Sequence, residues 1–196
     1  MFSDIKDLYP DFATWPTVPN GTSRTDNGHP HNWEREALAR LILRQQAAVV
    51  FEFGTFMGAT ANYIASIPCV TKVLTLNIPP KERPLLSMRD IDLSYTQNTA
   101  RDILDGKVTQ LWGDSTAFDF VPYAQAVDLA WVMGAHSPEY IASDLRSAFG
   151  MLRPGGTVVL HAGDIESLVA ARLYQYDLYV IGERMAVVRE QTGFRA

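Results

Sequence analysis

The chain has 196 residues, 47% of them hydrophobic, which is enough for one compact domain with a sizeable core and short for two. A net charge of -5, with Lys and Arg scattered along the chain, argues against a nucleic-acid-binding surface. The single cysteine, Cys69, excludes an intramolecular disulfide and a cysteine-rich metal site. There is no signal-peptide pattern and no apolar run near the ~20 residues of a spanning helix, so we expect a soluble, cytoplasmic protein without a membrane partner.

Residues 1–30 are predicted to form an irregular N-terminal arm or lid. Prolines, glycines and asparagines interrupt any regular pattern in this segment. Apolar anchors are also present, namely Phe2, Leu8, Tyr9, Phe12 and Trp15. We expect the arm to cover part of a binding site, with a surface arm or a homo-oligomer contact as the alternative.

Residues 31–196 are predicted to form the main domain, which opens with a helix over 31–46. An apolar run over 49–53 predicts a buried parallel strand, and a helical pattern begins after Gly58. Gly54 and Gly58 lie in the turn between them. Glycine lets the backbone turn sharply and approach a ligand, while free N–H groups at the helix start face that ligand. A role in packing alone is the alternative for these two glycines.

Strands and helices alternate through the rest of the chain. We predict strands over 72–77, 108–112, 127–133 and 157–161, and helices over 92–104, 137–152 and 165–173. Ser137 is expected to cap the second of these helices, with Pro138 in its first turn. Residues 176–181 and 184–190 flank a Gly182-Glu183 turn and predict an antiparallel hairpin. This order predicts a single α/β domain with a doubly wound, mostly parallel sheet.

Four segments in chain order resemble the class I S-adenosylmethionine-dependent methyltransferases, and most closely the small-molecule O-methyltransferase branch. They are Glu-Phe-Gly-Thr-Phe-Met-Gly (52–58), Gly-Asp-Ser (113–115), Val-Asp-Leu-Ala-Trp-Val-Met-Gly-Ala-His-Ser-Pro-Glu-Tyr (127–140) and Leu-Arg-Pro-Gly-Gly-Thr-Val-Val-Leu-His (152–161). The resemblance extends over residues 37–189. It implies a Rossmann-like, seven-stranded sheet whose last strand is antiparallel, and S-adenosyl-L-methionine as the cofactor. It also implies methyl transfer to a small hydroxylated acceptor, such as a sugar or a natural product.

The resemblance assigns cofactor-binding roles to residues after two strands. Glu52 would hold the ammonium group of the cofactor, because an ionised carboxylate between a buried strand and a glycine turn needs a partner. Backbone along the same ligand would come from Gly54, Thr55, Phe56 and Gly58. Asp114 and Ser115 would contact the amine and the ring edge of the adenine, with a turn cap as the alternative for Asp114.

Two positions depart from the family pattern. Asn77 stands where an acidic residue usually accepts both ribose hydroxyls, and its amide can accept one such bond and donate another. Met133 replaces an Asp at the end of the fourth strand, and a thioether neither takes a proton nor ligates a hard cation. We therefore predict no metal, and we expect Met133 to pack against the cofactor or in the core.

Three residues remain for chemistry, namely His136, His161 and Asp164. His136 follows the fourth strand at the sheet edge where α/β proteins bind ligands, and an imidazole suits proton transfer near neutral pH. We predict His136 as the catalytic base and His161 and Asp164 as substrate-binding residues. A site of both histidines and Asp164 for a softer metal ion is the competing interpretation. Two further readings stay open: a protein that kept this fold but lost methyl transfer, and a scaffold or assembly subunit.

Overall fold

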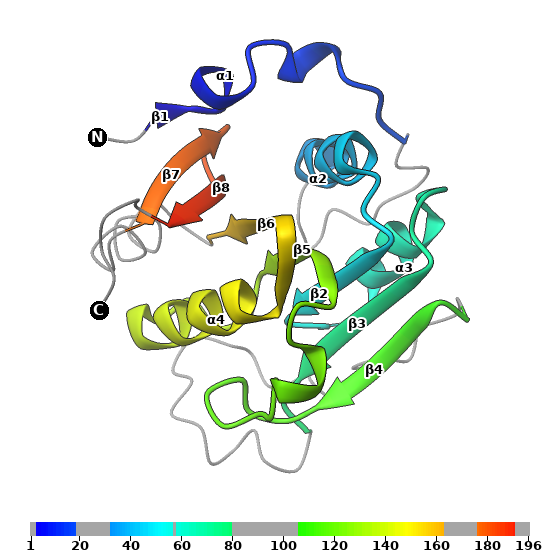
Figure 1. The fold of residues 1–196 in the computed structure, drawn as a ribbon, viewed down its shortest axis with the longest axis vertical. Coiled ribbons are helices and arrows are strands. Elements are labelled where there is room, and N and C mark those ends of the chain that lie inside the picture. The colour runs from blue at the N-terminus through cyan, green and yellow to red at the C-terminus, as the bar shows by residue number, and fades with distance from the viewer. Residues whose placement is uncertain (1–2, 19–31, 57, 80–105, 163–175, 191–196) are drawn as a thin grey trace.

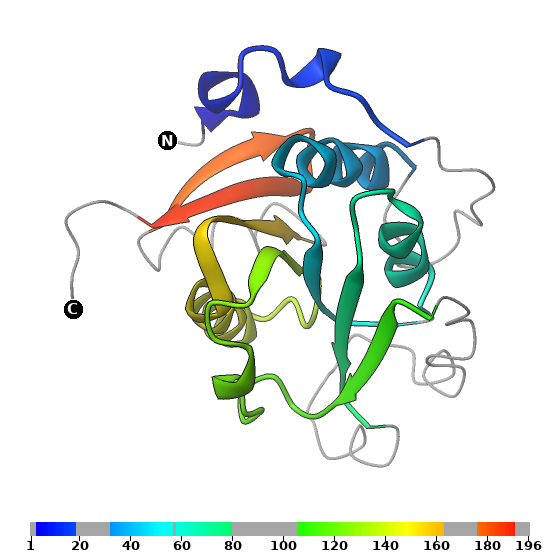
Figure 2. The same cartoon turned by 45° about the vertical axis from the view of Figure 1, so that its right-hand side comes forward.

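The computed structural model describes residues 3–18, 32–56, 58–79, 106–162 and 176–190. They build an eight-stranded sheet in the order β1-β7-β8-β6-β5-β2-β3-β4 (Figure 1; Figure 2). The strands are β1 (Ser3–Asp4), β2 (Val49–Phe53), β3 (Lys72–Asn77), β4 (Val108–Trp112), β5 (Val127–Val132), β6 (Leu152–His161), β7 (Tyr176–Ile181) and β8 (Met185–Glu190). The helices are α1 (Ile5–Leu8), α2 (Asn32–Gln45), α3 (Ala59–Ser66) and α4 (Pro138–Met151), with 3-10 turns at Phe12–Thr14 and Val121–Tyr123.

The order and direction of the strands confirm a doubly wound α/β fold. Strands β2 to β6 pair in parallel, and β8 runs antiparallel to both β6 and β7. The predicted hairpin is therefore confirmed, and the predicted strands over 72–77 and 108–112 have the expected bounds. The predicted helices over 92–104 and 165–173 lie outside the described residues.

The prediction of seven strands was wrong, because the start of the N-terminal arm adds an eighth. Ser3 and Asp4 pair in parallel with Tyr179 and Val180 on the edge strand β7. Asp4 then caps α1: its side chain accepts from the backbone N–H of Lys6 at 2.8 Å, while its own N–H donates to Asp7 at 3.0 Å. This is a reciprocal capping box. Residues 3–14 are thus not irregular throughout, and residues 19–30 of the predicted arm or lid lie outside the described part of the chain.

The connection from α4 to β6 also differs from the prediction. The strand begins at Leu152 rather than at Thr157, and Leu152 pairs with Val127. The register shifts after this pair: Leu129, two residues after Val127, pairs with Thr157, five residues after Leu152. Gly155, with φ +84°, lies in the irregular stretch, where a left-handed residue bends the strand. Ser137 occupies the N-cap position of α4 but makes no capping hydrogen bond.

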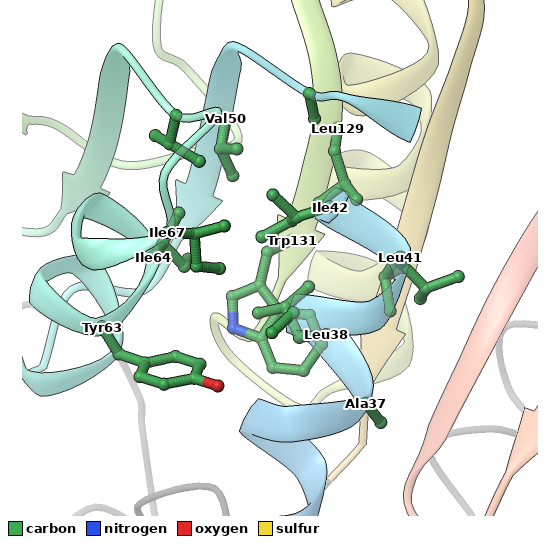
Figure 3. Close-up of a cluster of buried hydrophobic side chains, with 14 of the residues drawn as sticks. Ala37, Leu38, Leu41, Ile42, Val50, Tyr63, Ile64, Ile67, Leu129 and Trp131 are labelled. Atoms are coloured by element: carbon green, nitrogen blue, oxygen red, sulfur yellow. The ribbon is translucent and has the colours of Figure 1, made fainter. Parts of the chain in front are cut away.

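Helices cover the two faces of the sheet and bury two separate clusters. Helices α2 and α3 lie on one face, and α4 lies on the other (Figure 1; Figure 2). Along β2 the side chains alternate between these faces: Val50 packs under α2 and α3, whereas Phe51 and Phe53 pack with α4. The same alternation turns Glu52 toward α2 and α3. Figure 3 shows the cluster on that face, where Trp131 of β5 lies among side chains of both helices.

Candidate functional site

The candidate site lies at the carboxyl edge of the parallel strands, where β2 separates β5 from β3. The chain leaves β2 through α3 to reach β3 on one side, whereas β5 pairs with β2 on the other side. The loops after β2 and β5 therefore leave the sheet at a topological switch point. Open α/β sheets bind ligands at such a point. Residues 54–58 and 133–137, which sequence analysis singled out, occupy these two loops.

The turn after β2 has three residues in left-handed backbone conformation. Gly54 has φ +90°, Phe56 +48° and Gly58 +87°. A side chain on Gly54 would place its Cβ 2.2 Å from the carbonyl oxygen of Met133, so glycine is required there by contact between the two loops. Packing thus accounts for Gly54. Phe56 adopts the left-handed conformation without being a glycine. This conformation costs a residue with Cβ about 1–2 kcal/mol, and strained backbone of this kind gathers at ligand sites.

Glu52 is fully buried and lies at the end of a chain of polar side chains across three strands. Thr75 of β3 donates its hydroxyl to Glu52 Oε2 at 2.5 Å. The hydroxyls of Thr75 and Thr55 are 2.7 Å apart, and Gln110 of β4 donates to Thr55 at 3.0 Å. The Thr55 side chain is therefore engaged within the protein, so that only its backbone could serve a ligand. The chain of hydrogen bonds fixes the position of one Glu52 oxygen.

The other oxygen of Glu52, Oε1, has no hydrogen-bond partner among the described residues. Burial raises the pKa of Glu52 to about 8, and the hydrogen bond from Thr75 opposes this shift. The ionised form that the sequence suggested is therefore disfavoured at neutral pH without a cation beside it. A buried polar atom without a partner is costly, and a ligand cation would remove that cost.

Asn77 and Met133 hold the positions that depart from the family pattern. Asn77 ends β3 and is half-buried, and its backbone carbonyl accepts a hydrogen bond from the N–H of Gly113 at 3.0 Å. Its backbone thus fixes the loop after β4 that contains Asp114. Met133 is half-buried and packs against the cluster under α2 and α3, in line with the core alternative.

Asp114 acts as a turn cap in the loop after β4. Its Oδ1 accepts from the backbone N–H and the hydroxyl of Thr116, at 2.9 and 2.8 Å. Its Oδ2 accepts from the hydroxyl of Tyr140 on α4 at 3.1 Å, and burial raises the pKa of Tyr140 to about 12. A carboxylate oxygen accepts about two hydrogen bonds, so Oδ2 keeps one position for a ligand donor. The turn-cap alternative is confirmed, and adenine binding by Asp114 and Ser115 stays a prediction.

Asp144 of α4 is a site residue that the sequence analysis missed. It is 1% exposed, and neither oxygen of its carboxylate has a hydrogen bond of normal geometry within the described residues, although the Ser115 side chain is close enough to interact with it. It lies against the loop after β5, since a Cβ on Gly134 would be 3.0 Å from its Oδ2. Burial raises the pKa of Asp144 to about 7, while Ser115 opposes the shift and Asp114 adds to it. The sequence could have indicated this residue, because Asp144 is a charged residue on the apolar face of the helix predicted over 137–152.

The two histidines occupy different environments. His136 follows β5 and is exposed, whereas His161 at the end of β6 is 7% exposed. The Nε2 atom of His161 lies 3.3 Å from Oε1 of Glu34, a fully buried residue of α2. Glu34 lies in the first turn of α2, and the sequence analysis assigned it no role. Asp164 lies outside the described residues, so its place beside His161 stays a prediction.

Within the described ranges no three His, Cys, Asp or Glu side chains gather in a way that could hold a metal ion. No helix in those ranges is long and apolar enough to cross a membrane.

Comparison with known proteins identifies the family. A family profile described as "Methyltransferase domain" matches residues 51–162, more than half of the chain. The chain belongs to this methyltransferase family. The matched part of the chain begins within β2 and ends just after β6, so it contains every strand end at the candidate site. Comparison with curated proteins gives no match.

Solved structures share the fold of this chain at low sequence identity. SAH-bound PaMTH1 from Podospora anserina has 12% identity and a TM-score of 0.59, over 94% of this chain and 93% of its own. The SAM-bound O-methyltransferase TomG from Streptomyces achromogenes has 18% identity and a TM-score of 0.56, over 82% of each chain. Cofactor-bound Rv0187 from MTB has 19% identity and a TM-score of 0.52, over 95% and 90%.

The chain spans 63% of one other matched chain, from the complex that contains the Haloferax volcanii Trm112 methyltransferase activator. The TM-score between the two chains is 0.49.

Proposed function

We propose that this protein binds S-adenosyl-L-methionine and transfers its methyl group to a hydroxyl oxygen of a small acceptor, such as a sugar or an aromatic natural product. The observation that carries the proposal is Glu52. Its buried carboxyl group ends β2 at the topological switch point, with one oxygen held by Thr75 and the other without a partner among the described residues. Such a group is suited to receive an ammonium ion that enters from the sheet edge.

Residues at the ends of β2, β3 and β4 are proposed to contact the rest of the cofactor. The backbone of Gly54 to Gly58 would run along the methionine end, with the N–H groups at the start of α3 directed to the ligand. Asn77 would hydrogen-bond the ribose, and Asp114 would accept from the adenine amine through the free position on Oδ2. When bound, the cofactor supplies an electrophilic methyl group on a sulfonium. The protein would orient the acceptor in line with that methyl group and exclude water.

A hydroxyl acceptor also needs a group that takes its proton. His136 is the base that the sequence predicts, and its exposed position after β5 leaves it open to an acceptor. His161 and Asp164 are proposed to contact the acceptor from the end of β6. We further propose that the protein acts in the cytoplasm.

Isothermal titration calorimetry with S-adenosylmethionine and S-adenosylhomocysteine tests the cofactor assignment directly. We expect binding of at least one ligand below millimolar concentration. Gly58→Val should abolish binding while the circular dichroism spectrum is retained, because a branched side chain cannot adopt φ +87° and would enter the ligand path. A folded wild-type protein that binds neither ligand at millimolar concentration would exclude this function and favour a scaffold role.

Asn77 favours one second candidate, a protein that kept the fold and lost methyl transfer. It lacks the charge that usually accepts the ribose hydroxyls, so cofactor affinity would be reduced. Asn77→Asp should tighten binding by about 1 kcal/mol if the side chain faces the ribose, because a charge-assisted hydrogen bond replaces a neutral one. Calorimetry measures this change, and unchanged affinity would place the Asn77 side chain elsewhere. Cofactor binding without methyl transfer to any acceptor would favour the second candidate.

A further inference from the structure

The side chains of Glu52, Trp131 and His161 lie side by side under α2 at the carboxyl edge of the sheet. Trp131 of β5 pairs in register with Glu52 of β2, and its indole ring contacts the imidazole of His161 with a centroid distance of 5.5 Å. Glu34 of α2 approaches the same imidazole at 3.3 Å. Trp131 Nε1, Glu52 Oε1 and His161 Nδ1 have no hydrogen-bond partner within the described residues.

From this arrangement we infer that Glu34 and His161 form the proton-accepting pair for the acceptor, with His161 as the catalytic base and Glu34 as its positioning residue. The inference rests on the proposed function and assigns its base to His161 in place of His136, the base predicted from the sequence. Trp131 lies between His161 and Glu52, because it contacts the His161 ring and pairs in register with Glu52 on the neighbouring strand. An acceptor bound to His161 would therefore lie on the same face of the sheet as the methionine end of the cofactor that Glu52 would bind. His136 is exposed on the other loop of the switch point.

The two ring nitrogens of His161 have different surroundings. Nε2 is within ion-pair range of Glu34, although the two atoms are not aligned as a hydrogen bond. With the proton on Nε2 directed at the carboxylate, the lone pair lies on Nδ1, which is free to accept a second proton. A carboxylate that orients an imidazole in this way also stabilises the imidazolium that forms.

The proton and electron pairs balance in one step. The acceptor O–H bond breaks and its proton passes to Nδ1 of His161. The oxygen electron pair forms the new O–CH₃ bond while the S–CH₃ bond breaks, and sulfur retains that electron pair as a neutral thioether. The imidazolium then returns its proton to solvent.

A purely structural role for the pair is the competing explanation, and the chain contains a control for it. Gln45 of α2 donates to the hydroxyl of Thr157 on β6, so the same helix and strand are joined a second time away from the carboxyl edge. A buried ionisable pair costs desolvation and is a poor way to add stability that apolar side chains could supply. A structural role predicts that removing either α2–β6 contact has similar effects.

Nuclear magnetic resonance tests the inference without any enzymatic assay. Long-range ¹H–¹⁵N spectra at pH 8.5 should show His161 as the Nε2–H tautomer. Glu34→Gln should alter the His161 signals strongly, whereas Gln45→Met should leave them nearly unchanged. A His161 protonated on Nδ1, or a spectrum insensitive to Glu34→Gln, would overturn the inference and leave the proposed cofactor binding intact.

Turnover gives the second measurement, with S-adenosylmethionine and a panel of phenols, catechols and sugars as acceptors. We expect His161→Gln to reduce kcat at least a hundredfold and Glu34→Gln about tenfold, with cofactor affinity unchanged in both. His161→Ala should regain activity with added imidazole, which a structural contact would not. Gln45→Met should stay within about twofold of wild type. Loss of turnover in His136→Ala but not in His161→Gln would overturn the inference, whereas failure to bind the cofactor would count against the proposed function itself.

Discussion

At the scale of single residues, two buried carboxyl groups are expected to make the stability and the ligand affinity of the protein depend on pH. Glu52 faces α2 and α3, and Asp144 lies on α4 on the opposite side of the sheet. Burial raises the pKa of both, to about 8 and about 7. For an acid with a raised folded-state pKa, the ionised form destabilises the fold. That cost is greatest above the folded pKa and disappears as the pH falls toward the unfolded value.

We expect Asp144→Asn to stabilise the protein at pH 8. Ionised Asp144 costs stability above pH 7 because its pKa is raised from 3.8, and a neutral amide avoids that cost. The gain should be on the order of 2–4 kcal/mol at pH 8 and should shrink toward zero near pH 4. Urea denaturation at both pH values measures it, with the exposed Glu183→Gln as control. An equal effect of Asp144→Asn at both pH values would show that folding does not raise the pKa of Asp144.

We expect the affinity for S-adenosylmethionine to rise between pH 6 and pH 8. Without ligand, Glu52 holds a proton below its pKa of about 8, and an ammonium partner must displace that proton. Affinity should gain up to about tenfold per pH unit over this range, with proton release. Glu52→Gln should bind more weakly at pH 8 and lose the pH dependence. Calorimetry in two buffers of different ionisation enthalpy measures the released proton, and a pH-independent wild type would contradict the role of Glu52.

At the scale of elements, the β7–β8 hairpin contacts the start of α2 through one glycine. Gly182 in the turn has φ +62°, and a Cβ there would lie 2.4 Å from the ring of Trp33. The hairpin therefore packs against α2 at Trp33, the residue that precedes Glu34. Gly155 offers a comparison, since it has φ +84° but no atom within 4 Å of a Cβ position.

We expect Gly182→Ala to destabilise the protein more than Gly155→Ala does. Both variants carry the left-handed backbone cost of about 1 kcal/mol, but only the first adds a clash with Trp33. The difference should be about 1–2 kcal/mol in urea denaturation. The double variant Gly182→Ala with Trp33→Ala should lose this difference. Equal costs for the two single variants would mean that the Trp33 ring moves aside freely.

Elements were predictable from the sequence where local patterns decide them. The runs at 72–77 and 108–112 formed strands with the expected bounds. A continuous run explains 72–77, where four consecutive residues are buried between two other strands. The run at 108–112 forms the edge strand β4, in which no residue is buried. The strand at Ser3–Asp4 has two residues and depends on pairing with Tyr179 and Val180, far along the chain. The approach of Glu34 to His161 likewise joins α2 to β6. Contacts between residues this far apart in the chain produce no periodic pattern in the sequence, so sequence patterns do not predict them.

At the scale of the whole molecule, the sheet sorts the candidate groups onto two faces around one edge. Glu52, Trp131 and His161 lie under α2 and α3, whereas Asp114 and Asp144 gather at α4. The residue that we propose as the base, His161, is thus separated from the carboxylate that we propose to bind the adenine, Asp114. Both groups meet the loops at the topological switch point between β2 and β5. The arrangement favours one extended ligand that crosses the edge.

Methyl transfer by this protein is expected to need no divalent metal. Hard cations such as Mg²⁺ require several oxygen ligands in near-octahedral geometry, and Met133 supplies none at the end of β5. At the end of β6 the chain reads His161-Ala162-Gly163-Asp164, and His161 already faces Glu34. A softer ion would need His136, His161 and Asp164 together, but His136 is exposed while His161 is buried. Metal analysis of protein purified without chelator, followed by assay with and without EDTA, measures the requirement. Stoichiometric metal, or activity removed by EDTA and restored by one ion, would contradict the prediction.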